Sequence, residues 1–201
     1  MPRQKAFHPD AALDRAIDLF WRKGFEGTSL SALLATMEIS RQSLYNTFGN
    51  KQQLFLAVLD RYGQMQELQR LGLEQETAGL ETIQKYFHRL LSGMESQPEY
   101  GACLMTVAAV ELGLQDWAVQ SRVEAYDSVL AGAFRNALER ASFRGELRED
   151  LDLSLQADQL VALSKGLGAM ARGGMGLARL RLLVDASLAL LSSASEKDTT
   201  E

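Results

Sequence analysis

One face of a short predicted helix, from Arg41 to Phe48, carries side chains that can hydrogen-bond to the edges of DNA bases. With a rotation of about 100° per residue, Leu44 and Phe48 fall on one side of this helix. The polar residues opposite and beside them are Arg41, Gln42, Ser43, Tyr45 and Asn46. Arg and Gln form bidentate hydrogen bonds with guanine and adenine, and Ser and Asn hydrogen-bond to bases or phosphate. The pattern predicts a face that contacts bases in the major groove.

The residues around this helix predict the elements that would position it. Thr28 and Ser29 can cap a preceding helix, and Ser40 can cap the helix itself. The buried stripe of the preceding helix is Leu30, Leu33 and Leu34. A capped first helix, a tight turn and a short second helix with one buried face make a helix-turn-helix. The segment from Thr28 to Phe55 therefore predicts this motif, with duplex DNA as its partner.

This segment resembles the N-terminal domain of the TetR-type transcriptional repressors. The shared pattern is T-x-x-x-L…S-x-x-x-L-Y-x-x-F-x-x-K-x-x-L-F, and the matching positions are Thr28, Ser40, Leu44, Tyr45, Phe48, Lys51, Leu54 and Phe55. An upstream apolar face fits as well; it consists of Leu13, Ala16, Ile17, Phe20 and Trp21 and ends at Gly24. The resemblance runs from about residue 8 to 62.

The resemblance implies an all-α fold in which an N-terminal three-helix DNA-binding head precedes a larger helical ligand-binding and dimerisation domain. We expect the head at residues 1–50, the larger domain at 51–192 and a disordered, Ser/Thr- and charge-rich tail at 193–201. It also implies phosphate contacts from Thr28, Tyr45 and Lys51. Lys51 begins the next predicted helix, where backbone N–H groups favour an anion.

The turn position departs from the family pattern, as does Leu34, where a small residue is common. The turn residue between the two helices, often Gly in TetR-type proteins, is Glu38 here. A non-Gly residue with positive φ costs on the order of 1 kcal/mol, which does not forbid the turn. If Glu38 did spoil the turn, the chain would instead be a helical protein-interaction module that does not bind DNA.

Composition favours a helical globular protein of 201 residues, with 46% hydrophobic residues and three prolines. No apolar stretch approaches a membrane span and no leader opens the chain, so we expect a cytoplasmic protein. Net charge is −5, but residues 1–61 carry eight Lys/Arg against six Asp/Glu, whereas the remainder carries 13 against 20. A mildly basic head on an acidic body would orient DNA binding, although a net of +2 is also ordinary scatter.

The chain after the head predicts further helices separated by short breakers. Their ranges are about 51–70, 79–95, 102–113, 116–142, 153–172 and 177–191. The last two have apolar residues on more than one face, and the family resemblance implies that residues 157–172 and 177–191 build a homodimer interface. An intramolecular core explains this pattern almost as well.

The family resemblance also implies an effector, which is an unidentified small molecule. Aromatic and soft side chains that could line an apolar pocket are Phe87, Met105, Trp117, Tyr126 and Phe134, although these residue types at helical spacing also form plain core. Cys103 follows a break at Gly101, so we expect it in the first turn of a helix, where the dipole lowers a thiol pKa. The segment from Gly101 to Met105 resembles a Gly/Cys-Leu motif of a TetR subgroup with cysteine sensors; an inert thiol is the other interpretation.

Nothing in the sequence predicts an enzyme. It contains no Gly-rich phosphate loop, no recognisable pair of catalytic carboxylates and no Cys/His metal cluster, and His8 and His88 are the two histidines. We expect no cofactor and no metal. The sequence thus predicts a ligand-responsive transcriptional regulator, a repressor that binds a near-palindromic operator as a dimer and is released by an effector.

Overall fold

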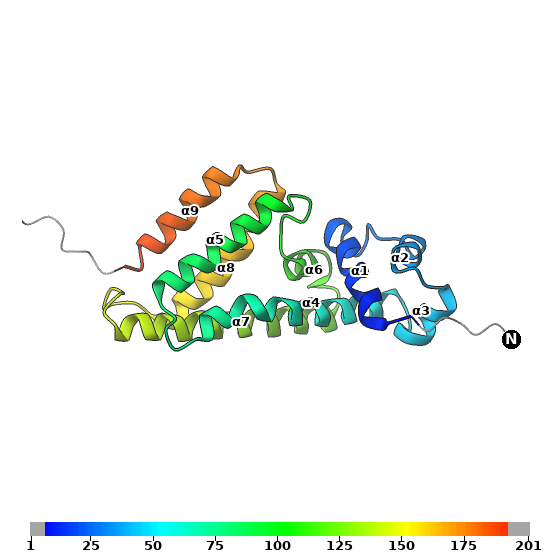
Figure 1. Ribbon diagram of the computed structural model, residues 1–201, viewed down its shortest axis with the longest axis horizontal. Coiled ribbons are helices and arrows are strands. Elements are labelled where there is room, and N and C mark those ends of the chain that lie inside the picture. Colours follow the sequence, from blue (N-terminus) through cyan, green and yellow to red (C-terminus); the bar gives the residue numbers. More distant parts are fainter. Residues whose placement is uncertain (1–6, 193–201) are drawn as a thin grey trace, which may run out of the picture. The chain divides into compact units, whose positions relative to one another are not determined.

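The computed structural model describes residues 7–192, and every named element within that range is an α-helix (Figure 1). The helices are α1 (Pro9–Lys23), α2 (Leu30–Met37), α3 (Arg41–Phe48), α4 (Lys51–Glu74), α5 (Leu80–Ser96), α6 (Leu104–Leu112), α7 (Trp117–Phe143), α8 (Leu153–Arg172) and α9 (Leu177–Ala189). The predicted all-α fold is confirmed. The predicted tail at 193–201 lies outside the described residues.

The described chain forms two compact units. The first comprises the residues up to Gln66 together with Cys103–Tyr126, and the second comprises Glu67–Ala102 and the residues from Asp127 onward. These units differ from the sequence ranges 1–50 and 51–192, because α4 and α7 each contribute to both units and α6 belongs to the first. The division into functional domains at residue 50 stays a prediction.

A single apolar core holds the first unit together. Phe20 of α1, Leu33 of α2 and Leu44 of α3 are fully buried, as is Phe55 of α4. The rings of Phe20 and Phe55 lie 4.9 Å apart, centroid to centroid. Burying a side chain of this size contributes roughly 1.5 to 3 kcal/mol, so this core is what fixes the short helices α2 and α3.

Both helices of the motif begin at a serine cap. The Ser29 hydroxyl accepts a hydrogen bond from the Ala32 N–H at 3.2 Å, and the Ser40 hydroxyl accepts one from the Ser43 N–H at 3.0 Å. Each cap satisfies a backbone donor that the first helical turn leaves unpaired. The serines that the sequence pattern selects therefore set where α2 and α3 start.

The turn between α2 and α3 forms with Glu38 in the left-handed conformation, at φ 56° and ψ 40°. Arg15 of α1 compensates: its guanidinium donates to the Met37 carbonyl at 3.2 Å and to the Glu38 carboxylate at 2.7 Å. This contact satisfies a carbonyl at the end of α2 and places a cation at its negative end. The departure from glycine at this position does not prevent the turn.

The second unit packs α5, α8 and α9 with the C-terminal part of α7. Phe87 of α5 and Phe134 of α7 are fully buried and stack at 5.9 Å. The Asp152 carboxylate caps α8 by accepting from the Ser154 and Leu155 N–H groups, each at 3.0 Å. Within residues 7–192, no helix is both long and apolar enough to cross a membrane.

We predict that Glu38→Gly is more stable than Glu38→Ala by about 1 kcal/mol, because both changes remove the Arg15 ion pair and only alanine keeps a Cβ at positive φ. Chemical denaturation of the two variants measures this difference. Equal unfolding free energies would show that Glu38 carries no backbone strain.

Candidate nucleic-acid interface

The polar face of α3 is exposed while its apolar side is anchored. Gln42 and Asn46 lie one turn apart on this face, and the Gln42 amide nitrogen donates to the Asn46 side-chain oxygen at 2.8 Å. This pairing uses one Gln42 N–H and the Asn46 oxygen, so it leaves the Gln42 carbonyl oxygen as an acceptor and the Asn46 N–H groups as donors for a base edge. Arg41 is exposed at the start of the helix and Tyr45 is 44% exposed. Ser43 is half-buried, with its hydroxyl 2.9 Å from that of Ser40.

Lys51 is the first residue of α4, and its ammonium group is held over an aromatic ring. The Lys51 Nζ atom lies 4.2 Å from the centroid of the Phe25 ring, a cation–π contact. The preceding residue, Asn50, caps the same helix by accepting from the Gln53 N–H at 2.8 Å. A cation and a helix N-terminus at one point suit a phosphate group.

Thr28 is the predicted phosphate contact that the structure does not bring to the surface. Its side chain is fully buried, and its hydroxyl donates to the Gly24 carbonyl at 2.6 Å. The Thr28 N–H in turn donates to the Phe25 carbonyl at 3.2 Å. In this arrangement the Thr28 hydroxyl fastens the connector between α1 and α2 and does not face solvent.

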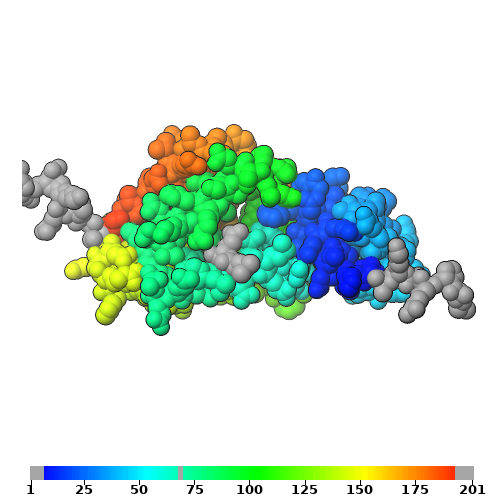
Figure 2. Space-filling model, in the orientation of Figure 1, coloured from blue at the N-terminus to red at the C-terminus, as the bar shows by residue number. Residues whose placement is uncertain are grey.

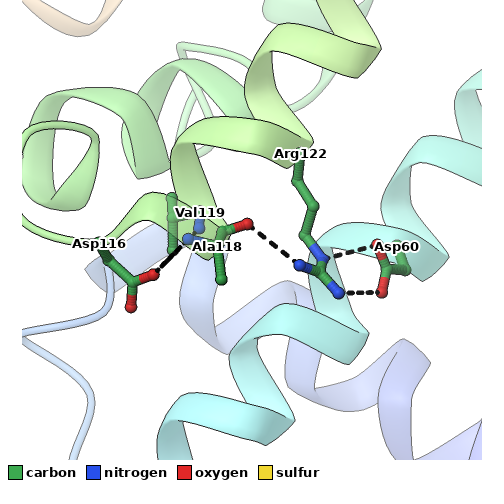
Figure 3. A network of polar contacts seen from close by, with 5 residues as sticks. All are labelled: Asp60, Asp116, Ala118, Val119 and Arg122. Carbon is green, nitrogen blue, oxygen red and sulfur yellow. Dashed lines mark hydrogen bonds and ion pairs between the residues drawn. The ribbon is translucent and has the colours of Figure 1, made fainter.

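Polar contacts that the sequence pattern did not predict attach the start of α7 to α4 within the first unit. The Arg122 guanidinium makes two hydrogen bonds to the Asp60 carboxylate, at 2.8 and 3.0 Å, and donates to the Ala118 carbonyl at 3.0 Å (Figure 3). Asp116 caps α7 by accepting from the Ala118 and Val119 N–H groups. Asp60 and Arg122 are 62 residues apart, so no local spacing signals this pair.

The residues predicted to line an effector pocket are divided between the two units. Phe87 and Phe134 lie in the second unit and are fully buried in its core. Met105, Trp117 and Tyr126 belong to the first unit: Met105 is buried, Tyr126 is half-buried and Trp117 is 79% exposed. Burial favours the plain-core interpretation for Phe87, Phe134 and Met105.

Cys103 is half-buried and immediately precedes α6, one residue before the helical turn in which the sequence predicted it. The Tyr62 hydroxyl donates to its sulfur at 3.3 Å. Burial is the main cause that raises the pKa of Tyr62 well above its ordinary value. Tyr62 therefore remains a protonated donor to the sulfur at neutral pH.

A groove of about 640 Å³ lies between α7 and α8 in the second unit. Its charged lining residues are Asp127, Arg135, Asp158 and Lys165. The Lys165 ammonium group and the Asp127 carboxylate form an ion pair across it. The groove is lined by other residues than those predicted for the effector pocket. Among residues 7–192, no group of three or more His, Cys, Asp and Glu side chains is placed to hold a metal ion.

Comparison with known sequences identifies the family. Residues 12–58 match the family described as bacterial regulatory proteins, tetR family, and residues 79–173 match the tetracyclin repressor-like C-terminal domain. The chain is 34% identical over 193 residues to the uncharacterized HTH-type transcriptional regulator YezE of Bacillus subtilis, covering 95% of this chain and 100% of that protein. It is 29% identical over 190 residues to the HTH-type transcriptional repressor ComR of Escherichia coli, covering 94% and 90%.

Solved structures agree with the sequence comparison. The TetR family regulator CifR, a cysteine mutant complexed with 26-base-pair operator DNA, is 31% identical, with a TM-score of 0.81 over 93% of this chain and 98% of that one. Reduced NemR from E. coli shares the fold, at 21% identity and a TM-score of 0.82 over 94% of this chain and 100% of that one. The chain belongs to the TetR family. Its relatives are transcriptional regulators, and the resemblance stated from the sequence is confirmed.

We predict that Ser40→Ala destabilises the protein by about 1 kcal/mol, because it removes the cap of α3. Thr47→Ala is the matched control, since Thr47 is exposed in the same helix. Urea denaturation monitored by circular dichroism measures both. A Ser40→Ala variant as stable as Thr47→Ala would show that the cap does not hold α3.

Proposed function

We propose that this protein is a repressor that binds a near-palindromic operator as a dimer and is released by a small-molecule effector. The observation that carries the proposal is the exposed polar face of α3. Buried Leu44 fixes the opposite face of this helix, and the Lys51 cation follows in sequence at the start of α4. A polar face that reads bases beside a cation that holds phosphate is what a helix-turn-helix requires. The complex of CifR with operator DNA supports it.

The proposed base contacts come from α3 and the proposed phosphate contacts from its neighbours. Arg41 and Gln42 would contact guanine and adenine edges, and Ser43 and Asn46 a base or phosphate. Tyr45 and Lys51 would hold phosphate. Thr28 would act indirectly, by fixing the connector through its buried hydroxyl.

The proposed dimer interface is formed by α8 and α9, within residues 157–172 and 177–191. The face of the molecule in Figure 2 includes α9, drawn in orange and red. Large apolar side chains exposed on or directly beside these helices are Met170 of α8, Leu182 of α9, Leu190, which is the C-cap of α9, and Leu155, which is in α8 just before residue 157. Exposed apolar side chains on adjacent helices suit a helical interface between two copies. Two heads related by a twofold axis would read half-sites about one helical turn, roughly 34 Å, apart.

An effector would release the operator only if it binds the conformation without DNA more tightly. A coupling free energy of about 1 to 3 kcal/mol would weaken operator binding about 5- to 150-fold. The candidate effector residues in the first unit are Cys103, Met105, Trp117 and Tyr126. Of these, Cys103 and Tyr126 are half-buried.

We predict that Lys51→Ala and Arg41→Ala each abolish the operator shift in a gel assay without unfolding the protein, because each removes a proposed contact at an exposed or half-exposed site. The operator is first selected from random DNA fragments with the purified protein. Lys85→Ala is the matched control, since it removes one positive charge from an exposed lysine of α5 in the second unit.

Selection from random DNA also decides between the two function classes. Recovery of a near-palindromic site supports the repressor, whereas a helical protein-interaction module predicts no salt-dependent, sequence-selective retention of DNA. If both variants retarded the operator as strongly as the unmodified protein, the assignment of α3 and Lys51 would be wrong.

We predict that Leu182→Arg shifts the protein from dimer toward monomer in sedimentation velocity, because it places a charge on a 62%-exposed leucine in the proposed interface. Val110→Arg is the control: Val110 is 83% exposed on α6, outside α8 and α9. A Leu182→Arg variant that stays dimeric at the lowest measurable concentration would place the interface elsewhere.

A further inference from the structure

We propose that Glu111, on α6, is a positioning residue for Lys51, so that operator affinity depends on the Glu111 carboxylate although that group does not touch DNA. The proposal rests on the proposed function, because it takes Lys51 as a phosphate contact. All of the residues that carry it belong to the first compact unit.

The Glu111 carboxylate holds the connector that joins α1 to α2. Its Oε2 atom accepts a hydrogen bond from the Phe25 N–H at 2.5 Å. The carboxylate also lies directly against Gly24, where a Cβ atom would be 1.8 Å from Oε1. Gly24 has φ 72°, which favours glycine, and a Cβ atom there would displace the Glu111 carboxylate.

The Phe25 N–H needs an acceptor from another part of the chain because α1 has ended. The Gly24 N–H makes the last bond of that helix, to the Phe20 carbonyl at 2.8 Å. The turn at Gly24 then directs the next N–H away from the helix. A carboxylate is the stronger kind of acceptor for a backbone N–H, because one partner is charged.

Phe25 transmits this constraint to Lys51. The centroid of its ring lies 5.1 Å from the centroid of the Phe55 ring. The Lys51 Nζ atom lies over the same Phe25 ring, 4.2 Å from the centroid. The Phe25 carbonyl accepts from the Thr28 N–H at 3.2 Å, which fixes the backbone on the other side. A backbone held by Glu111 and a ring held by the core place the cation–π partner of Lys51 at one position.

A second acidic side chain makes a parallel contact next to Lys51. Asp116, at the start of α7, accepts a hydrogen bond from the Gln52 side-chain amide of α4. The segment from α6 to the start of α7 therefore contacts the connector at Phe25 and the first turn of α4 at Gln52. The connector contains Phe25, the aromatic partner of Lys51, and α4 begins with Lys51 itself. A displacement of α6 would therefore change the position of Lys51 through these polar contacts.

A double-mutant cycle on the dimeric protein and its selected operator tests the inference. We expect Glu111→Ala to weaken operator binding at least about tenfold. The slope of the logarithm of the binding constant against the logarithm of the salt concentration should fall in magnitude by about 1 per DNA-binding head, as it would on loss of one phosphate contact. Glu111→Gln keeps an acceptor for the Phe25 N–H and should stay within about threefold of the unmodified protein. In a Lys51→Ala background, whose residual affinity is measured at low salt, Glu111→Ala should have almost no further effect, because the two changes remove the same contact.

Matched variants separate this role from simple destabilisation. Glu124→Ala removes an exposed carboxylate from α7 in the same unit and should bind normally. Phe25→Leu keeps the N–H bond to Glu111 but removes the ring under Lys51, so it should reproduce the loss seen in Glu111→Ala. This variant also carries the test if Glu111→Ala does not fold.

Three results would overturn the inference. Glu111→Ala that binds normally while Lys51→Ala binds weakly would overturn it and leave the proposed function intact. If Glu111→Ala lowered operator affinity by the same factor with and without Lys51, the role of Glu111 would be merely structural. Normal operator binding by Phe25→Leu would show that the ring does not position Lys51. A fourth result, normal binding by Lys51→Ala, would remove the phosphate contact from the proposed function and, with it, the inference.

Discussion

The proposed DNA-binding surface depends on the burial of one side chain, Leu44. Helix α3 has eight residues, all of them described, and Leu44 is the one that is fully buried. Isolated helices of this length are not stable in water, so α3 exists because Leu44 packs into the core of the first unit. The Ser40 cap sets where the helix begins, but packing sets its rotation. The face that carries Gln42 and Asn46 is exposed because the opposite face is anchored.

Local spacing predicted the helices and the caps of the motif because those features depend on neighbouring residues. Ser29 and Ser40 are caps, and α3 has the predicted bounds from Arg41 to Phe48. The family pattern raised the case of a positive φ at Glu38, and Glu38 has φ 56°. The compensating contact from Arg15 was not predicted, because Arg15 lies 23 residues from Glu38 and meets it only when α1 packs on α2.

The parts of the site that the sequence could not predict are contacts between distant segments. Thr28 matched the family pattern for a phosphate contact, but its environment is set by Gly24, whose carbonyl accepts from its hydroxyl. Glu111 and Phe25 are 86 residues apart, and Gln52 and Asp116 are 64 apart. A helical pattern assigns Glu111 to a polar face and says nothing of its partner. Residue type and spacing also do not distinguish pocket from core, so they could not show that Phe87 and Phe134 are fully buried.

The acidic residues whose contacts lie next to Lys51, the proposed phosphate contact, show why net charge is a weak guide to DNA binding in this chain. Glu111 and Asp116 contribute to the negative charge that follows residue 61. Both carboxylates accept hydrogen bonds from N–H donors of the first unit, so part of their charge is compensated at short range. Their effect at Lys51 is then to position a cation, not to repel phosphate. An effector would change operator affinity through them only if it alters these contacts in one of two conformations, because a ligand without differential affinity shifts no equilibrium.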